Sequence, residues 1–294
     1  MKSVAALIKT IRPHQWVKNV FVAAPLVFSR HLTDVDQVAR TAIAVLAFCL
    51  LSGAVYAFND VRDVEADRAH PKKRLRPIAA GALSERNAMI AAVALAVIAL
   101  IACSLLSWKL ALFAGGYLVQ NMAYSVWLKH IAFVDVGVIA NGFLLRVLAG
   151  AAAINVPASP WLLICTVLLA VFLGFGKRAH ELAWAERSGS DKTTRAALTG
   201  YRLPMLRWAM LVLAAVTVLA YGAYTLDGRT VAFFGTDRLV YSAPFVAAAI
   251  VRFLFLALWR PKDDSPTEAM FKDPWFLLIL AGAVATILVI IYGR

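Results

Sequence analysis

Charged residues are scarce in this sequence, making up 16% of its 294 residues, whereas 62% are hydrophobic. This composition excludes an ordinary soluble domain and is typical of a membrane protein. The 30 lysine and arginine residues outnumber the 17 acidic ones, an excess that favours a nucleic-acid partner in a soluble protein. Here the basic residues gather in loops between long apolar segments, so we expect contact with a membrane and none with nucleic acid.

The residues that usually build zinc sites or act as nucleophiles are few and scattered. Cys49, Cys103 and Cys165 each lie in an apolar stretch without Cys-x-x-Cys or Cys/His spacing, which argues against a disulfide framework and a zinc site. None of the five histidines has a second histidine at metal-ligand spacing. The sequence also lacks a convincing Ser/His/Asp or Cys/His set, so we expect no side-chain nucleophile.

Nine apolar segments reach or approach the length of a membrane-spanning helix. They lie near residues 17–30, 38–58, 87–106, 110–128, 134–154, 160–176, 206–226, 240–259 and 273–292. The first is the weakest, because it is short and contains Pro25. We therefore predict an all-α, polytopic membrane protein with about nine transmembrane helices, in which residues 1–294 form a single domain.

Basic residues set the expected orientation of these segments. Most of the 30 lysine and arginine residues fall in alternate loops, which the positive-inside rule assigns to the cytoplasm. The two longest polar loops, residues 59–86 and 177–207, then face the cytoplasm together. Residues 1–16 combine apolar and basic side chains at helical spacing, which predicts an amphipathic helix lying on the membrane surface.

An acidic cluster follows the second predicted span. Asn59, Asp63 and Asp67 are spaced four residues apart and Asp60 lies one step around, so an amide and three carboxylates share one helix face. Crowded carboxylates at a membrane boundary need a neutralising cation, and Mg²⁺ prefers such oxygen ligands while leaving positions for phosphate oxygens. The spacing predicts that these four residues bind a magnesium-diphosphate group, with the three aspartates as catalytic carboxylates. A solvated acidic face, paired with nearby basic residues, is the alternative.

The pattern Asn-Asp-x-x-Asp-x-x-x-Asp at residues 59–67 resembles the first aspartate-rich motif of the UbiA superfamily of intramembrane prenyltransferases. Residues 72–81, Lys-Lys-Arg-Leu-Arg-Pro-Ile-Ala-Ala-Gly, resemble the basic segment of the same family. The similarity covers nearly the whole chain. It implies a bundle of nine helices around a central cavity that opens to the cytoplasm.

Other stretches resemble the branch of this superfamily that acts on decaprenyl phosphate as a phosphoribosyltransferase. They lie within residues 12–19, 24–29 and 124–150. After the sixth predicted span, where a prenyltransferase carries a second acidic motif, residues 176–181 read Gly-Lys-Arg-Ala-His-Glu. A Lys-Arg pair at this point repels magnesium and attracts phosphate directly.

This resemblance implies transfer of a 5-phosphoribosyl group from phosphoribosyl pyrophosphate to a polyprenyl (decaprenyl) phosphate, with Mg²⁺ as cofactor. The expected location is the inner (plasma) membrane of a bacterium, where the product supplies arabinose for cell-envelope glycans. The division of the basic residues between the two phosphorylated substrates stays open, as does assembly into a homo-oligomer. The candidate substrate-binding residues are Lys18, Asn59, Lys73, Arg74, Arg76, Tyr124, Lys129, Arg146, Lys177, Arg178 and Glu181.

Arg146 lies near the middle of the fifth predicted span. An arginine at that depth costs about 3 kcal/mol on insertion scales, so it is expected to face the interior of the bundle and to have a partner. Asp135 and a substrate phosphate are both candidate partners. A purely structural ion pair between helices is an equally good explanation.

Two other functions fit parts of the sequence. A UbiA prenyltransferase, which moves a polyprenyl chain to an aromatic or glyceryl acceptor, shares the fold and the first acidic motif. It also needs a second acidic motif, which residues 176–181 do not supply. A transporter of this size often has repeated halves and polar groups near the middle of the bilayer, whereas the polar clusters here gather at one face.

Overall fold

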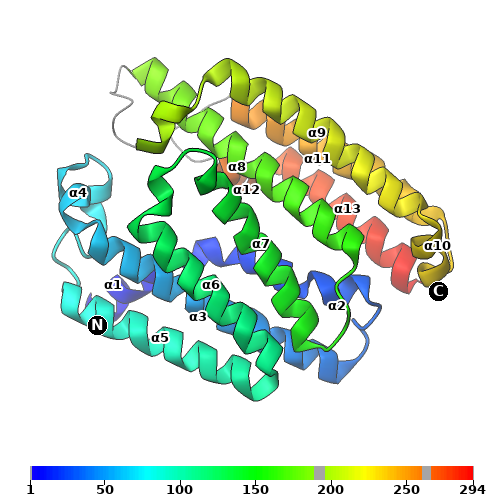
Figure 1. The fold of residues 1–294 in the computed structure, drawn as a ribbon, viewed down its shortest axis with the longest axis horizontal. Helices are drawn as coiled ribbons and strands as arrows, with labels where there is room; N and C mark the ends of the chain where they lie inside the picture. The colour runs from blue at the N-terminus through cyan, green and yellow to red at the C-terminus, as the bar shows by residue number, and fades with distance from the viewer. Residues whose placement is uncertain (1, 189–195, 260–265, 294) are drawn as a thin grey trace. The chain divides into compact units, whose positions relative to one another are not determined.

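The computed structural model of the chain describes residues 2–188, 196–259 and 266–293. Within these ranges the backbone forms helices and no strand, which confirms the all-α prediction (Figure 1). In the described part of the chain, seven helices are long and apolar enough to cross a membrane, so the chain is a multi-pass membrane protein. They are α3 (Val35–Arg62), α5 (Glu85–Leu106), α7 (Val134–Ala153), α8 (Pro160–Ser188), α9 (Leu203–Leu226), α11 (Ala243–Leu258, preceded by the 3₁₀ helix η6, Arg238–Ser242) and α13 (Pro274–Tyr292).

The segment near residues 17–30, predicted as the first span, is not one long helix. It forms the 3₁₀ helix η1 (Pro13–Ala23) and then the short helix α2 (Ala24–Phe28). Pro25 lacks an N–H group and lies in the first turn of α2, so it cannot continue the preceding helix. The predicted count of nine spans is therefore not confirmed.

The segment near residues 110–128 forms α6 (Trp108–Val126), a helix of 19 residues that is not among the seven. Lys109, Gln120 and Asn121 lower its hydropathy. An exposed tryptophan lies at each end of it, Trp108 at 71% and Trp127 at 65% exposure. Because of this composition, α6 is not counted among the candidate membrane spans.

Both segments predicted as cytoplasmic loops are partly helical. In residues 59–86, α3 continues to Arg62 and is followed by α4 (Val64–Ala69) and the 3₁₀ helix η2 (Lys73–Leu75). In residues 177–207, α8 continues to Ser188 because Ala179, Leu182 and Ala183 extend its buried stripe at helical spacing. Residues 189–195 of that segment lie outside the described ranges. The other short helices are η3 (Leu128–His130), η5 (Ala196–Gly200), α10 (Gly228–Phe234) and α12 (Pro266–Lys272).

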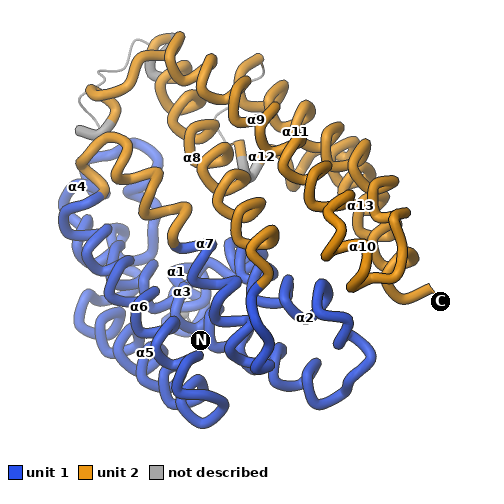
Figure 2. Tube along the Cα trace, turned by 45° about the vertical axis from the view of Figure 1, so that its right-hand side comes forward, with its two compact units in different colours: residues 1–128, 142–158 blue, residues 129–141, 159–294 orange. Residues whose placement is uncertain are grey.

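The chain divides into two compact units (Figure 2). Unit 1 comprises residues 1–128 and 142–158, and unit 2 comprises residues 129–141 and 159–294, so the division falls within α7. In unit 1, α3 packs along α5 through small residues such as Ala47 and Ala92, which let the two backbones approach closely. In unit 2, α8, α9 and α11 pack around larger side chains, including Phe172 and Phe253, whose ring centroids are 5.2 Å apart.

A small apolar core in unit 1, here called the satellite core, joins the elements around the end of α3. Its buried members come from α1 (Lys2–Ile11), α4, the segment after η2 and the start of α5. They are Ala6, Val64, Ile78, Leu83 and Ala88. Burial of these side chains fixes α1, α4 and the segment after η2 against one another. In α1, Ala6 is buried whereas Val4 and Ile8 are exposed, and the predicted location on the membrane surface stays a prediction.

Candidate active site

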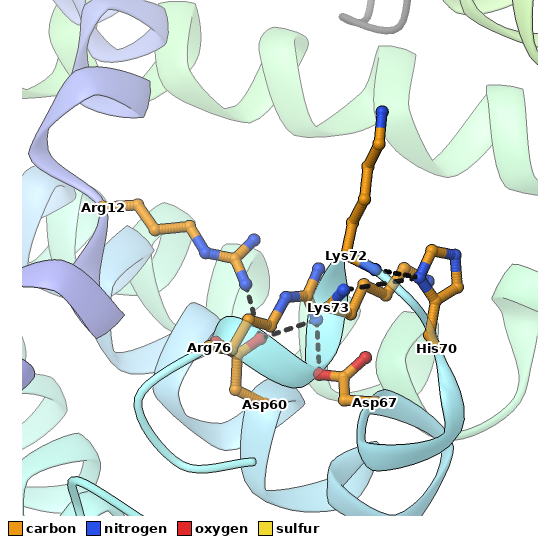
Figure 3. A network of polar contacts seen from close by, with 7 residues as sticks. All are labelled: Arg12, Asp60, Asp67, His70, Lys72, Lys73 and Arg76. Carbon is orange, nitrogen blue, oxygen red and sulfur yellow. Dashed lines mark hydrogen bonds and ion pairs between the residues drawn. The ribbon is translucent and has the colours of Figure 1, made fainter. Parts of the chain in front are cut away.

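Two carboxylates and two arginines meet at the end of α3 (Figure 3). Asp60 Oδ1 accepts hydrogen bonds from Arg12 Nη2 at 2.5 Å and from Arg76 Nη1 at 3.1 Å. The same nitrogen of Arg76 donates to Asp67 Oδ2 at 2.6 Å. The aspartate side chains are buried, at 1% and 3% exposure, whereas the two arginine side chains are 21% and 27% exposed. These four residues are called the acid–arginine cluster below.

The backbone explains how residues distant in sequence reach this cluster. Asp60 belongs to the last turn of α3, and Asp67 belongs to α4, which begins after a turn at Asp63. Arg76 has an extended backbone because it precedes a proline, whose ring disfavours the helical conformation at the residue before it. Arg12 follows α1 in the left-handed conformation, with φ 52°. The satellite core holds α1, α4 and the segment after η2 together, so the side chains attached to them converge.

In the part of the chain that the structure describes, one buried oxygen of the cluster is without a hydrogen bond. Asp60 Oδ2 is buried and has no hydrogen-bond partner among the described residues. A buried carboxylate oxygen in this state suits a cation, and Mg²⁺ needs only one or two protein carboxylates when phosphate oxygens complete its shell. Asp60 and Asp67 therefore fit a magnesium ion. Asp63 does not join them in a ready-made site, since no group of three or more His, Cys, Asp or Glu side chains in the described ranges is arranged to hold a metal.

The other candidates in unit 1 are exposed or only partly buried. They are Asn59 and Asp63 at the end of α3, Lys73 and Arg74 in η2, Lys18 in η1 and Tyr124 near the end of α6. Lys18 Nζ donates to Gln15 Oε1 at 2.7 Å. The backbone N–H groups of Lys72 and Lys73 donate to His70 Nδ1, which fixes the turn between α4 and η2 (Figure 3). The substrate contacts expected of these residues, and of Lys129, Lys177 and Glu181 in unit 2, stay predictions.

Arg12 is the member of the cluster that the sequence pattern does not reveal. In the sequence it is one basic residue of an amphipathic surface segment, and Asp60 is 48 positions away. A partial signal is present in Pro13, because the residue before a proline tends to leave the helical conformation and so to end the helix. That signal predicts where α1 ends but not which carboxylate the Arg12 side chain meets.

Unit 2 contains a second charged cluster, around the fully buried side chain of Arg178. Arg178 Nε lies 2.8 Å from Asp135 Oδ2, and Nη1 contacts the carboxylate of Glu181. Tyr201 OH donates to Asp135 Oδ1 at 2.7 Å. The arginine predicted to bind phosphate is thus enclosed by two carboxylates of its own chain. Lys177, its neighbour on α8, is partly exposed.

Replacing Arg178 with methionine is expected to destabilise the protein by about 3 kcal/mol, because Asp135 would be buried without its cationic partner. Thermal unfolding of the purified protein in detergent measures this loss. The control is Arg207→Met on α9, where the arginine is exposed and little change is expected. An Arg178→Met variant that unfolds at the wild-type temperature contradicts a stabilising role for this ion pair.

Arg146 has a different environment from the one expected for a structural ion pair. Its side chain is 7% exposed and makes three hydrogen bonds, from Nε to Asn19 Oδ1 at 2.8 Å, from Nη1 to Gly142 O at 2.9 Å and from Nη2 to Tyr117 OH at 2.9 Å. The predicted burial with partners is confirmed. The candidate partner Asp135 is wrong, because that carboxylate pairs with Arg178 instead. All three acceptors of Arg146 are neutral groups.

Comparisons with known proteins found a matching family and several named relatives. The sequence profile of the UbiA prenyltransferase family matches residues 20–280. The decaprenyl-phosphate phosphoribosyltransferase of Mycolicibacterium smegmatis is 35% identical over an alignment 306 residues long, gaps included, which covers 98% of this chain and 93% of that protein. The protein of the same name from Mycobacterium tuberculosis H37Rv is 39% identical over 253 residues, which cover 84% of this chain and 83% of that protein.

Solved structures share the fold. A UbiA homolog from Archaeoglobus fulgidus bound to GPP and Mg²⁺ superimposes with a TM-score of 0.72 at 16% sequence identity, covering 97% of this chain and 99% of that chain. At this level of identity the likeness establishes a common helical architecture. Function has to be argued from the site and from the sequence relatives.

Proposed function

The chain belongs to the UbiA prenyltransferase family, and on that premise we propose that it transfers a 5-phosphoribosyl group from phosphoribosyl pyrophosphate to a polyprenyl phosphate. The observation that carries the proposal is the similarity of 98% of the chain to a decaprenyl-phosphate phosphoribosyltransferase. The acid–arginine cluster supports it, because carboxylates suit a metal-bound diphosphate and guanidinium groups suit phosphate oxygens. The proposed lipid acceptor is decaprenyl phosphate. The proposed location is the bacterial plasma membrane, with the acid–arginine cluster on its cytoplasmic side.

Donor binding is assigned to the acid–arginine cluster. Asp60 and Asp67 are the proposed ligands of Mg²⁺, with Asn59 and Asp63 next to them in the same motif. When bound, the ion neutralises charge on the leaving diphosphate. Arg12 and Arg76, whose side chains are partly exposed, bind phosphate oxygens of the donor and orient its ribose ring.

The proposed reaction is a displacement at ribose C1. The bond between C1 and the diphosphate oxygen breaks, and its electron pair leaves with diphosphate. An oxygen of the lipid phosphate attacks C1 from the opposite face and forms the new bond. Because the acceptor is already an anion, no side chain has to remove a proton, and catalysis depends on positioning and on stabilising the leaving group.

Replacing Arg76 with methionine is expected to raise KM for phosphoribosyl pyrophosphate by about 10- to 100-fold, because a charged donor to phosphate is lost. Initial rates over a range of donor concentrations, at saturating lipid phosphate, measure the change. Arg68→Met is the matched control, since Arg68 lies on α4 and pairs with the exposed Glu65. A wild-type KM in the Arg76→Met variant removes this arginine from donor binding.

A membrane assay with two labelled donors tests the proposed function. Membranes containing the protein are given labelled phosphoribosyl pyrophosphate with decaprenyl phosphate, or a labelled prenyl diphosphate with an aromatic acceptor. The proposal predicts labelled lipid in the first reaction and none in the second. The opposite result supports prenyl transfer, the activity that the family name suggests, and sinks phosphoribosyl transfer.

A further inference from the structure

Arg12 is held in a defined position by the residues around it. Its guanidinium carbon lies 4.9 Å from the centre of the Tyr56 ring, and its Nη2 donates to Asp60 Oδ1 at 2.5 Å. Its backbone is in the left-handed conformation, with φ 52°, which costs energy in residues other than glycine. Strain of this kind persists only where the surrounding structure enforces it, and it is found most often at functional sites.

The close approach of α1 to α3 depends on Gly53. A Cβ atom at this position would lie 3.0 Å from Ile11 Cβ, which is tighter than ordinary van der Waals contact. Because residue 53 is glycine, Ile11 at the end of α1 packs directly on α3, and the next residue is Arg12. Gly53 and Asp60 are seven residues apart on α3 and so share one face of that helix. The same face therefore seats the end of α1 and supplies the carboxylate that Arg12 meets.

The two arginines of the acid–arginine cluster are placed differently around Asp60. Arg76 Nη1 contacts both Asp60 and Asp67, so it joins the two proposed magnesium ligands. Arg12 approaches Asp60 from the side away from Asp67 (Figure 3). A magnesium-bound diphosphate at the two carboxylates is therefore next to Arg76. Arg12 is placed to meet a different phosphate group of the same small molecule.

The proposed donor has such a group. Phosphoribosyl pyrophosphate carries a diphosphate on ribose C1 and a second phosphate on C5, whereas a prenyl diphosphate carries the diphosphate alone. Asp60, Asp67 and Arg76 lie within residues 20–280, which match the UbiA prenyltransferase profile, and Arg12 precedes that range. The residues within the matched range are suited to the diphosphate that both donors share. Arg12 is suited to the phosphate that distinguishes them.

We propose that Arg12 binds the 5-phosphate of the donor and so selects phosphoribosyl pyrophosphate over donors that carry a diphosphate alone. The inference rests on the proposed function and deepens it, because it divides the two phosphate-bearing ends of the donor between the two arginines. Arg76 binds the diphosphate together with Mg²⁺. The Arg12 side chain is 21% exposed, so it is accessible to a ligand while it contacts Asp60.

Binding of two labelled donors tests this assignment. One is phosphoribosyl pyrophosphate, and the other is ribose 1-diphosphate, which lacks only the 5-phosphate. Both Kd values are measured with the purified protein and Mg²⁺, without the lipid acceptor. In Arg12→Met, the preference for phosphoribosyl pyrophosphate over ribose 1-diphosphate is expected to fall about tenfold or more, because a charged donor to the 5-phosphate is lost. A purely structural effect of the substitution would weaken both donors alike and leave the preference unchanged.

Arg76→Met is the contrasting variant, in which both Kd values should rise together because both donors carry the diphosphate. Lys9→Met is the matched control, since it removes one positive charge from an exposed position on α1 and should leave both Kd values unchanged. An unchanged preference in Arg12→Met overturns the assignment, and so does a loss of affinity confined to decaprenyl phosphate. A wild-type protein that binds neither donor would instead contradict the proposed function.

Discussion

Asp60→Asn is expected to lower the turnover of phosphoribosyl transfer by about 100- to 1,000-fold, the range found when a preorganised charge-stabilising group is lost. Asparagine keeps the size of the side chain but removes its negative charge. The buried Asp60 is the carboxylate that both Arg12 and Arg76 contact, and its second oxygen has no hydrogen bond among the described residues. Steady-state rates with labelled phosphoribosyl pyrophosphate and saturating Mg²⁺ measure the effect.

Glu65→Gln provides the matched control for this substitution. Glu65 is five residues from Asp60, its side chain is 82% exposed, and it pairs only with surface arginine in the described structure. The same loss of one carboxylate charge should therefore leave turnover within about twofold of wild type, as is usual for surface substitutions. If Asp60→Asn turned over as fast as Glu65→Gln, Asp60 would have no part in catalysis.

Removal of divalent metal is expected to abolish transfer completely. With a chelator present, the leaving diphosphate keeps its full negative charge and the two buried aspartates have no metal to share with it. Activity in washed membranes should fall to the level of membranes without the protein, and added Mg²⁺ should restore it. Titration of product formation against free Mg²⁺ makes the dependence quantitative.

The fold should survive the same treatment, which separates loss of metal from loss of structure. Asp60 and Asp67 already have cationic partners in Arg12 and Arg76, so their charges are balanced without a metal. The melting temperature in chelator should therefore equal that in buffer. Transfer that persists at full rate in chelator would contradict the magnesium assignment, whereas unfolding in chelator would assign the ion a structural role.

Most of the fold follows from apolar runs long enough to span a membrane. The runs near residues 38–58 and 87–106 fall within α3 and α5. Both helices begin and end within a few residues of the predicted bounds. The sequence is less informative where polar residues continue a helix. Lys177 and Arg178 suggest a loop, yet the buried stripe of α8 extends past them, because helical periodicity depends on which positions are apolar and not on mean hydropathy.

The candidate site could be predicted only in part. The motif at residues 59–67 points to Asp60 and Asp67, but the single helix face expected from their spacing is wrong, because α3 ends at Arg62 and Asp67 lies on α4 after a turn at Asp63. The contact of Arg12 with Asp60 depends on the satellite core, and the enclosure of Arg178 by Asp135 depends on packing within unit 2. Contacts between residues so far apart in the chain leave no periodic signal in a single sequence.

The two tryptophans that flank α6 give this helix a measurable depth in the bilayer. Tryptophan side chains prefer the headgroup level, and Trp108 and Trp127 are about 28 Å apart along a helix axis, close to the thickness of about 30 Å of a hydrocarbon core. The polar groups that lower the hydropathy of α6 include Gln120, which faces Gly142, while Tyr117 on the same helix binds Arg146. In a variant whose six other tryptophans are replaced by phenylalanine, quenching of tryptophan fluorescence by lipids brominated near the headgroup should therefore exceed quenching by lipids brominated at the chain ends. With that result, α6 would count as an eighth crossing whose polar side chains face the protein interior.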